Sequence, residues 1–199
     1  MTGVQTCALP ISVSLYETSL AAMVNQAANV LLGGVVPEPM GTEHPNIVPY
    51  QVFRAADRPF VLAAGNDRLF ERTCDAIGRS DLSADPRYAT NEARVRNRAE
   101  LIEVLETAFA GRPAEEWLRA LESRGVPCSP VPRMDEVFAS EEGAAMVQRV
   151  DDPVRGELSL VADPIRLSGE PAPVRRPPPR LGEHTHEILA ELERLRDRP

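Results

Sequence analysis

The chain of 199 residues contains no lysine, and all 22 of its basic residues are arginine. Without lysine it cannot form a Walker-type phosphate loop, in which a lysine contacts the phosphates. Thirty acidic residues outweigh the arginines and give a net charge of −8. This charge argues against a nucleic-acid partner, because phosphate binding needs clustered positive charge. The arginines are spread along the chain, which predicts a solvated, salt-bridged surface.

Cysteine and histidine are also scarce. The three cysteines, Cys7, Cys74 and Cys128, lack metal-ligand spacing, so we expect a reducing compartment with neither disulfides nor zinc. His184 and His186 lie two residues apart, and on a helix they face different directions and cannot share a metal ion. The sequence therefore predicts no metal site.

Long apolar runs and common catalytic motifs are missing as well. No apolar run approaches the roughly 20 residues of a membrane-spanning helix, and no targeting segment is visible, which predicts no membrane partner and a cytoplasmic location. The chain has no Gly-x-Gly-x-x-Gly, Gly-x-Ser-x-Gly or Cys-x-x-Cys. With 43% hydrophobic residues it nevertheless has enough apolar material for a core.

The first half of the chain gives clear local signals. Helical spacing of apolar residues predicts one buried or half-buried helix over 14–32, which ends at a glycine pair. Four prolines exclude a helix from 35–50. Alternating apolar residues then predict a β-hairpin over 50–65. Asn66 or Asp67 caps the helix that follows.

The second half alternates helices with extended segments. A long amphipathic helix is expected over 91–110, and Pro113 fits the first turn of the next helix, whose inner face includes Trp117. We expect Cys74, on the inner face of the earlier helix, to belong to the core. The remaining expectations are an extended connector over 126–132, a short helix over 134–138, a turn-strand-turn-strand segment over 151–167, a proline-rich strap over 169–180 and a helix over 184–197.

Two segments are candidate binding sites. The proline-stiffened loop GTEHPN, residues 41–46, can present side chains and backbone amides to a ligand, and His44 can donate a hydrogen bond or shuttle a proton near neutral pH. The alternative, an exposed histidine without a role, stays open. The helix N-terminus at Asn66 and Asp67 can bind an anion, but simple capping is favoured.

Several blocks of the sequence, in this order, resemble the C-terminal half of a class III CoA-transferase, the family that includes the CaiB/BaiF-type enzymes. The resemblance extends over about residues 13–190. The blocks are VSLYETSLAAMVNQAANVLLGG, HPNIVPYQVFRAADRPFVLAAGNDRLFERTCDAIGR, DPRYATNEARVRNR, GVPCSPVPRMDEVF and PPPRLGEHTHEIL.

The resemblance implies an α/β fold: a small α+β domain plus part of a Rossmann-like large domain, truncated in this chain. Residues 13–33 would be a helix and linker from the large domain, 34–145 the small domain, and 146–199 the segment that returns to the large domain. Complete family members would form an interlocked homodimer. A chain without its other half would expose apolar surface and aggregate.

The resemblance also implies a reaction of acyl-CoA metabolism. An aspartate attacks an acyl-CoA thioester to give a mixed anhydride, and the CoA thiolate returns to form an aspartyl-CoA thioester. The acceptor carboxylate then takes the CoA. Coenzyme A is thus part of a substrate, and no covalently bound cofactor is implied.

That aspartate lies upstream of the matched region in the family, so no catalytic residue is assigned in this chain, and the fragment alone is expected to be inactive. The resemblance places Gly41, His44 and Asn46 in a substrate-side loop, as binding residues. Two alternatives stay open: a fragment of an acyl-CoA racemase of the same family, which would use acid/base groups, and a non-catalytic module that pairs with a separate N-terminal half.

Residues 1–12, MTGVQTCALPIS, are unlike the rest of the chain. They have one cysteine, one proline, no charged residue and no apolar period. From its second residue the segment is similar to the translation of a common sequencing-library adapter. We therefore expect residues 1–12 to be an adapter-derived artefact and the gene product to begin near Val13.

Overall fold

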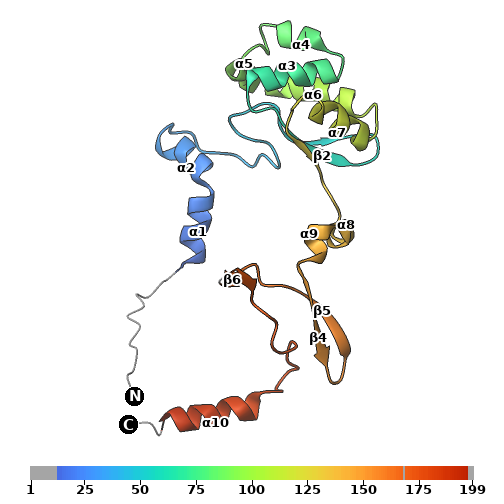
Figure 1. Ribbon diagram of the computed structural model, residues 1–199. Helices are drawn as coiled ribbons and strands as arrows, with labels where there is room; N and C mark the ends of the chain where they lie inside the picture. Colours follow the sequence, from blue (N-terminus) through green and yellow to red (C-terminus); the bar gives the residue numbers. More distant parts are fainter. Residues whose placement is uncertain (1–12, 168, 197–199) are drawn as a thin grey trace. The chain divides into compact units, whose positions relative to one another are not determined.

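The computed structural model describes residues 13–167 and 169–196. The segment 1–12, with Cys7 and the expected adapter sequence, lies outside the described residues. The chain divides into two compact units between Val131 and Pro132 (Figure 1). The domain boundaries implied by the family resemblance concern a complete enzyme and stay a prediction.

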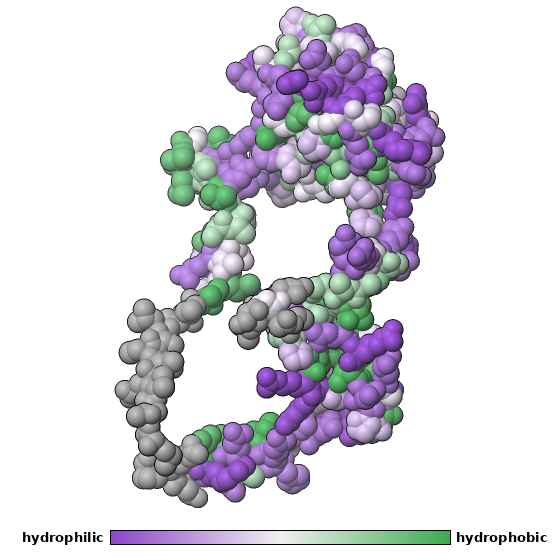
Figure 2. Space-filling model, in the orientation of Figure 1, coloured by the Kyte–Doolittle hydropathy of each residue, from purple (hydrophilic) through white to green (hydrophobic). Residues whose placement is uncertain are grey.

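The first unit begins with two short helices, α1 (Leu15–Ala22) and α2 (Val24–Leu31). The single helix expected over 14–32 is wrong in this detail: at Met23 the backbone turns to φ −88° and ψ 22°, which separates the two helices. Neither helix has a buried residue, and hydrophobic side chains gather on their surface (Figure 2). The exposed large hydrophobic residues are Leu15, Tyr16, Leu20, Met23, Val24, Val30 and Leu31.

A three-stranded antiparallel sheet forms the base of the first unit. The expected hairpin is present as β1 (Tyr50–Arg54) and β2 (Pro59–Ala63), with Val52 opposite Val61. The third strand, β3 (Cys128–Pro130), pairs with β2, although the sequence predicted only an extended connector there. Pro127 precedes this short strand and Pro130 ends it. The strand is defined by its pairing with the distant hairpin.

Helices cover the sheet: α6 and α7 contact its strands, and α3 packs against α7 and α4 (Figure 1). The expected helix over 91–110 is interrupted at Asn97, whose side-chain amide donates to the carbonyls of Arg87 and Ala93 at 3.0 and 2.9 Å. This contact holds Asn97 outside regular helical geometry, at φ −107° and ψ 27°. The helices are α3 (Asp67–Ala76), α4 (Ser80–Ala84), α5 (Asn91–Arg96), α6 (Arg98–Phe109) and α7 (Ala114–Glu122).

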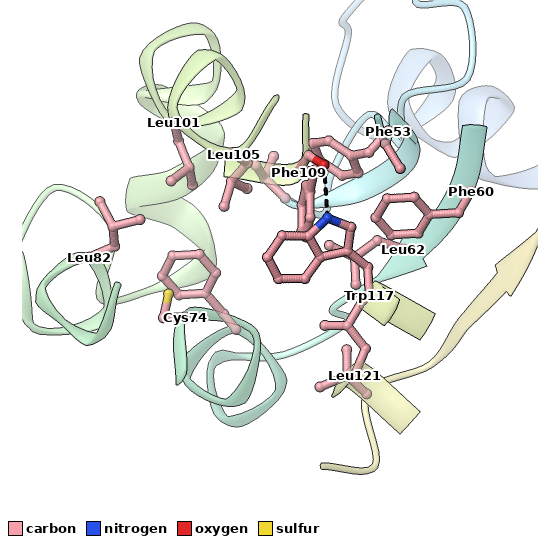
Figure 3. Close-up of a cluster of buried hydrophobic side chains, with 14 of the residues drawn as sticks. Phe53, Phe60, Leu62, Cys74, Leu82, Leu101, Leu105, Phe109, Trp117 and Leu121 are labelled. Atoms are coloured by element: carbon pink, nitrogen blue, oxygen red, sulfur yellow. Dashed lines mark hydrogen bonds between the residues drawn. The ribbon is translucent and has the colours of Figure 1, made fainter. Parts of the chain in front are cut away.

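Aromatic side chains join the sheet to the helices in the core. Phe109 of α6 lies 5.0 Å from Phe53 and 5.1 Å from Phe60, measured between ring centroids, and 5.4 Å from Trp117. The Trp117 indole N–H donates to the Phe109 carbonyl at 2.8 Å, as Figure 3 shows. A buried indole N–H needs such a partner, so packing and hydrogen bonding agree at this residue. Trp117 faces inward, as the helical pattern predicted.

The second unit contains a hairpin of β4 (Val147–Asp152) and β5 (Gly156–Val161). The sequence predicted β5, within the segment 151–167, but it did not predict β4. Gln148 of β4 holds the proline-rich strap: its side chain donates to the Ala172 carbonyl at 3.1 Å and accepts from the Val174 N–H at 2.7 Å. The other elements are α8 (Met134–Ala139), α9 (Glu141–Ala144), β6 (Arg166–Leu167), β7 (Glu170–Pro171) and α10 (Thr185–Arg196).

The mixture of helices and small sheets confirms the α/β class. In residues 13–167 and 169–196 every strand pairing is antiparallel. The Rossmann-like part implied by the resemblance therefore stays a prediction about a longer protein. No helix in these residues is long and apolar enough to cross a membrane.

We predict that Phe109→Ala lowers the free energy of unfolding by about 3–5 kcal/mol, because it leaves a cavity at the centre of the aromatic cluster. Urea unfolding followed by tryptophan fluorescence measures this change. Leu32→Ala removes a side chain that is 89% exposed and should change the value by less than about 0.5 kcal/mol. Equal effects of both variants would contradict the assignment of the core.

Candidate functional site

The candidate site is the loop of residues 41–50, which joins the helical pair to the sheet. Gly41 adopts φ +61°, a conformation that favours glycine, and turns the chain into the loop. The His44 N–H donates to the Tyr50 carbonyl at 2.9 Å, and the Val52 N–H donates to the Thr42 hydroxyl at 3.2 Å. The loop is thus closed on itself and on the first residues of β1.

A buried arginine holds the same loop from the helical side. Arg94 is fully buried, and its guanidinium donates to the Val48 carbonyl at 2.6 Å and to the Tyr88 carbonyl at 2.9 Å. A third bond, of 2.8 Å, reaches the Asp67 carboxylate. The guanidinium carbon also lies 4.4 Å from the centre of the Phe70 ring. The expectation that the arginines decorate the surface is wrong for Arg94.

Two further residues on the same helical stretch contact the loop. Asn91 accepts from the Val48 N–H at 3.1 Å and donates to the Asn46 carbonyl at 2.8 Å. Arg98 donates to the His44 carbonyl at 2.7 Å and the Pro45 carbonyl at 2.9 Å. Arg98 also pairs with Glu43, at 3.1 Å.

Sequence reasoning missed these three anchors. Positions 91, 94 and 98 recur at helical spacing, which was a signal that they share one face. Nothing in the sequence indicated that this face meets a loop almost 50 residues upstream.

His44 is half-buried between the loop and the helical pair. Its ring stacks on Tyr50, with ring centroids 5.3 Å apart and planes inclined by 11°. Its Nδ1 atom accepts from the Asn46 N–H at 3.1 Å, and its Nε2 atom lies 3.0 Å from the side-chain amide of Asn25. Partial burial lowers the pKa of His44, and the nearby positive charge of Arg98 lowers it further. The neutral ring is therefore favoured near pH 7.

Asn46 lines a cavity of about 230 Å³ between α2 and the segment 35–46. The predicted site residues His44 and Asn46 are in contact, whereas Gly41 shapes the backbone and has no side chain to offer. The cavity wall mixes carboxamides with apolar groups and one carboxylate: Gln26, Asn29, Val35, Val36, Pro37, Glu38, Met40, Pro45 and Asn46. Such a mixture suits a small ligand with an apolar body and a polar oxygen.

The second candidate, the N-terminus of α3, is occupied by its own side chains. Asn66 caps the helix by accepting from the Leu69 N–H at 2.9 Å. The Asp67 carboxylate accepts from the Asn91 N–H at 2.8 Å and from Arg94. The capping interpretation is therefore confirmed.

Among the described residues, the cysteines and histidines outside the loop do not form a metal-binding group. Burial raises the pKa of the Cys74 thiol to about 12, with a smaller contribution from Asp75, so the thiol stays protonated in the core. Across residues 13–167 and 169–196, no group of three histidine, cysteine or acidic side chains is arranged to hold a metal ion. His184 instead faces Glu187 at 3.5 Å.

Comparison with known proteins identifies the family. The family model of CoA-transferase family III matches residues 8–185. The succinate–glutarate CoA-transferase of Agrobacterium fabrum is 37% identical over 93% of this chain, and the human succinyl-CoA:glutarate CoA-transferase is 36% identical over 94%. The acetyl-CoA:oxalate CoA-transferase of Acetobacter aceti is 34% identical over 92%. The chain belongs to CoA-transferase family III.

A solved structure has the same fold. The crystal structure of a CaiB/BaiF family protein from Brucella suis superimposes with a TM-score of 0.69, at 36% identity and over 90% of this chain. The chain covers 47% of that protein, and it covers 47%, 43% and 46% of the Agrobacterium, human and Acetobacter proteins. It thus spans about half the length of the curated relatives that it matches.

We predict that Arg94→Met lowers the free energy of unfolding by about 2–6 kcal/mol, because two buried carbonyls each lose a donor at about 1–3 kcal/mol. Urea unfolding measures the loss. Arg96→Met, on the same helix, is the matched control: Arg96 pairs with Glu92 at the surface and should contribute less than about 1 kcal/mol. A comparable loss in both variants would contradict the role of Arg94.

We also predict that His44 titrates below its ordinary pKa of 6.5. The unfolded chain then binds more protons than the folded chain below pH 6.5, so His44 makes the free energy of unfolding fall as the pH drops through this range. NMR titration of the imidazole protons measures the pKa directly. Arg98→Met should raise it, because one cause of the lowered value is removed; an unchanged or lower value would contradict this account.

Proposed function

We propose that this chain is the C-terminal half of a CoA-transferase that moves CoA between an acyl-CoA thioester and a carboxylic acid. The observation that carries the proposal is the match of more than nine-tenths of the chain to proteins named for this reaction. Transfer is favoured over the racemase alternative, because these relatives are named as transferases.

The reaction proceeds through an aspartate that the other half of the complete enzyme supplies. The carboxylate oxygen of this aspartate bonds to the thioester carbonyl carbon, and the carbon–sulfur bond breaks to release the CoA thiolate. The thiolate then attacks the aspartyl carbonyl of the mixed anhydride and releases the donor acid. The acceptor carboxylate enters by the same two steps in reverse, which regenerates the aspartate.

In this proposal the loop of residues 41–50 lies on the substrate side of the site. His44 and Asn46 offer hydrogen-bonding groups beside a cavity with a partly apolar wall. A neutral His44 suits this role. CoA transfer between two carboxylates moves no proton to or from carbon, so the reaction does not need a protonated imidazole as an acid. We assign no catalytic residue in the chain itself, and we propose an interlocked homodimer for the complete enzyme.

The names of the relatives suggest the substrate class. Succinate, glutarate and oxalate are all dicarboxylates, and they appear in the names of the Agrobacterium, human and Acetobacter proteins. We propose a short dicarboxylic acid as one substrate of the complete enzyme.

A chimera tests the function: the part of the Agrobacterium enzyme that precedes the matched region, joined to residues 13–199. We predict CoA transfer from succinyl-CoA to glutarate by the chimera and none by the 199-residue chain alone. The measurement is chromatography of the CoA esters, with hydroxylamine added to trap an aspartyl-CoA adduct. Transfer by the chain alone would disprove the assignment of the aspartate to the other half.

Within the chimera, Asn46→Ala should raise the KM for the dicarboxylate about ten- to hundredfold, because a hydrogen bond to a charged group contributes about 1.5–3 kcal/mol. Arg96→Met serves as the control and should leave KM and kcat unchanged. A folded chimera in which Asn46→Ala leaves the KM unchanged would remove Asn46 from the binding site.

A further inference from the structure

Five side chains from α2 and the loop 41–50 form a continuous row. The His44 Nε2 atom lies 3.0 Å from the side-chain nitrogen of Asn25, and the side-chain oxygen of Asn25 accepts from the side-chain nitrogen of Asn46 at 3.5 Å. The same Asn46 nitrogen donates to the side-chain oxygen of Asn29 at 2.9 Å, and the side-chain nitrogen of Asn29 donates to the side-chain oxygen of Gln26 at 3.2 Å. Each contact joins one donor to one acceptor, so the orientation of one member constrains all the others.

The imidazole of His44 decides the direction of the row. A backbone N–H can only donate, so the Asn46 N–H at 3.1 Å makes His44 Nδ1 an acceptor. A neutral imidazole has one proton, which must then be on Nε2. Nε2–H is a donor, and it needs the oxygen of Asn25 opposite it, because an amide NH₂ at that place would bring two donors together.

This assignment exchanges the oxygen and nitrogen of Asn25 as they are placed in the structure. The remaining amides of the row must be exchanged with it, because the oxygen and nitrogen of an amide are assigned from its hydrogen-bond partners. With the Asn25 oxygen on His44, the Asn25 NH₂ group faces Asn46 and needs the oxygen of Asn46. The Asn29 NH₂ group then donates to this same oxygen, and Gln26 donates to the oxygen of Asn29. In the opposite direction, His44 would have to accept at both nitrogens, which a neutral ring cannot do.

We propose that Asn25 and the Asn46 backbone hold His44 as the neutral Nε2–H tautomer, and that this orients the row so that the Asn46 NH₂ group donates to an acyl oxygen of a substrate. In this orientation the Asn46 side-chain oxygen accepts hydrogen bonds from the NH₂ groups of Asn25 and Asn29. Both N–H bonds of the Asn46 side chain are then left for another acceptor. Asn25 and Asn29 are positioning residues that act through His44 and Asn46.

The cavity beside the row fits such a ligand. Gln26, Asn29 and Asn46 lie in its wall together with apolar groups, and its volume of about 230 Å³ suits a short acyl chain. Glu38 also lies in the wall and places one carboxylate there. The identity of the ligand rests on the proposed function, but the tautomer of His44 does not.

NMR on the full ¹⁵N-labelled chain tests the tautomer without any substrate. Long-range proton–nitrogen correlation distinguishes a bare ring nitrogen from a protonated one, in solution or by magic-angle spinning on sedimented protein. The His44 signals are assigned by their loss in His44→Gln, or by contacts with the Tyr50 ring if that variant does not fold. We expect a bare Nδ1 and a protonated Nε2; a proton on Nδ1, or an equal mixture, would overturn the proposal.

The second arm tests the free NH₂ group of Asn46 with two matched pairs of probes. Acetyl-CoA is compared with CoA, which lacks the acyl oxygen, and sodium succinate is compared with sodium chloride at equal ionic strength. We expect the Asn46 side-chain signals to shift with acetyl-CoA or succinate and not with their controls. No shift, or the same shift with the control, would overturn the ligand assignment.

The two arms separate this inference from the proposed function. A chimera without transferase activity that nevertheless shows the Nε2–H tautomer would refute the function and keep the positioning role. The Asn25→Asp variant adds a further check. It keeps an oxygen for His44 but turns Asn46 around, so the tautomer should persist while the response of Asn46 to acetyl-CoA is lost. Persistence of both would overturn the role of Asn25.

Discussion

The structure of the first unit depends on the buried guanidinium of Arg94. Burial of a cation is unfavourable unless its hydrogen bonds are satisfied, and here two carbonyls and one carboxylate satisfy them. The planar guanidinium reaches the loop, the segment before α5 and the start of α3 at once. Lysine has a single charged nitrogen and cannot span these three directions. One residue thus joins segments that are far apart in the sequence.

The same interaction prepares the candidate site. Because Arg94, Asn91 and Arg98 hold the backbone of the loop, the side chains of His44 and Asn46 are left to contact α2. A loop with a fixed backbone loses little conformational freedom on binding, which favours affinity. The α1–α2 pair keeps its apolar side chains exposed in this chain, which spans about half the length of the relatives that it matches.

Structural features that depend on neighbouring residues were predicted well. The hairpin of β1 and β2, the Asn66 cap and the inward face of Trp117 all follow from residues close together in the sequence. The errors have a common cause. The break at Asn97 and the short strand β3 depend on partners that are remote or lie outside the local period. The loop of residues 41–50 was singled out by the resemblance, and its three anchors were missed.

The sequence by itself determined the family, the α/β class and the order of most elements. Motif order supports the family, and apolar periodicity, which depends on residues close together in the chain, supports the elements. Only the tertiary structure decided that Arg94 is buried, because burial depends on which carbonyls surround a side chain. It also decided the partners of His44. A histidine in a loop has no defined tautomer until a fixed donor is placed beside one ring nitrogen, and here the turn that brings Asn46 back to His44 does so.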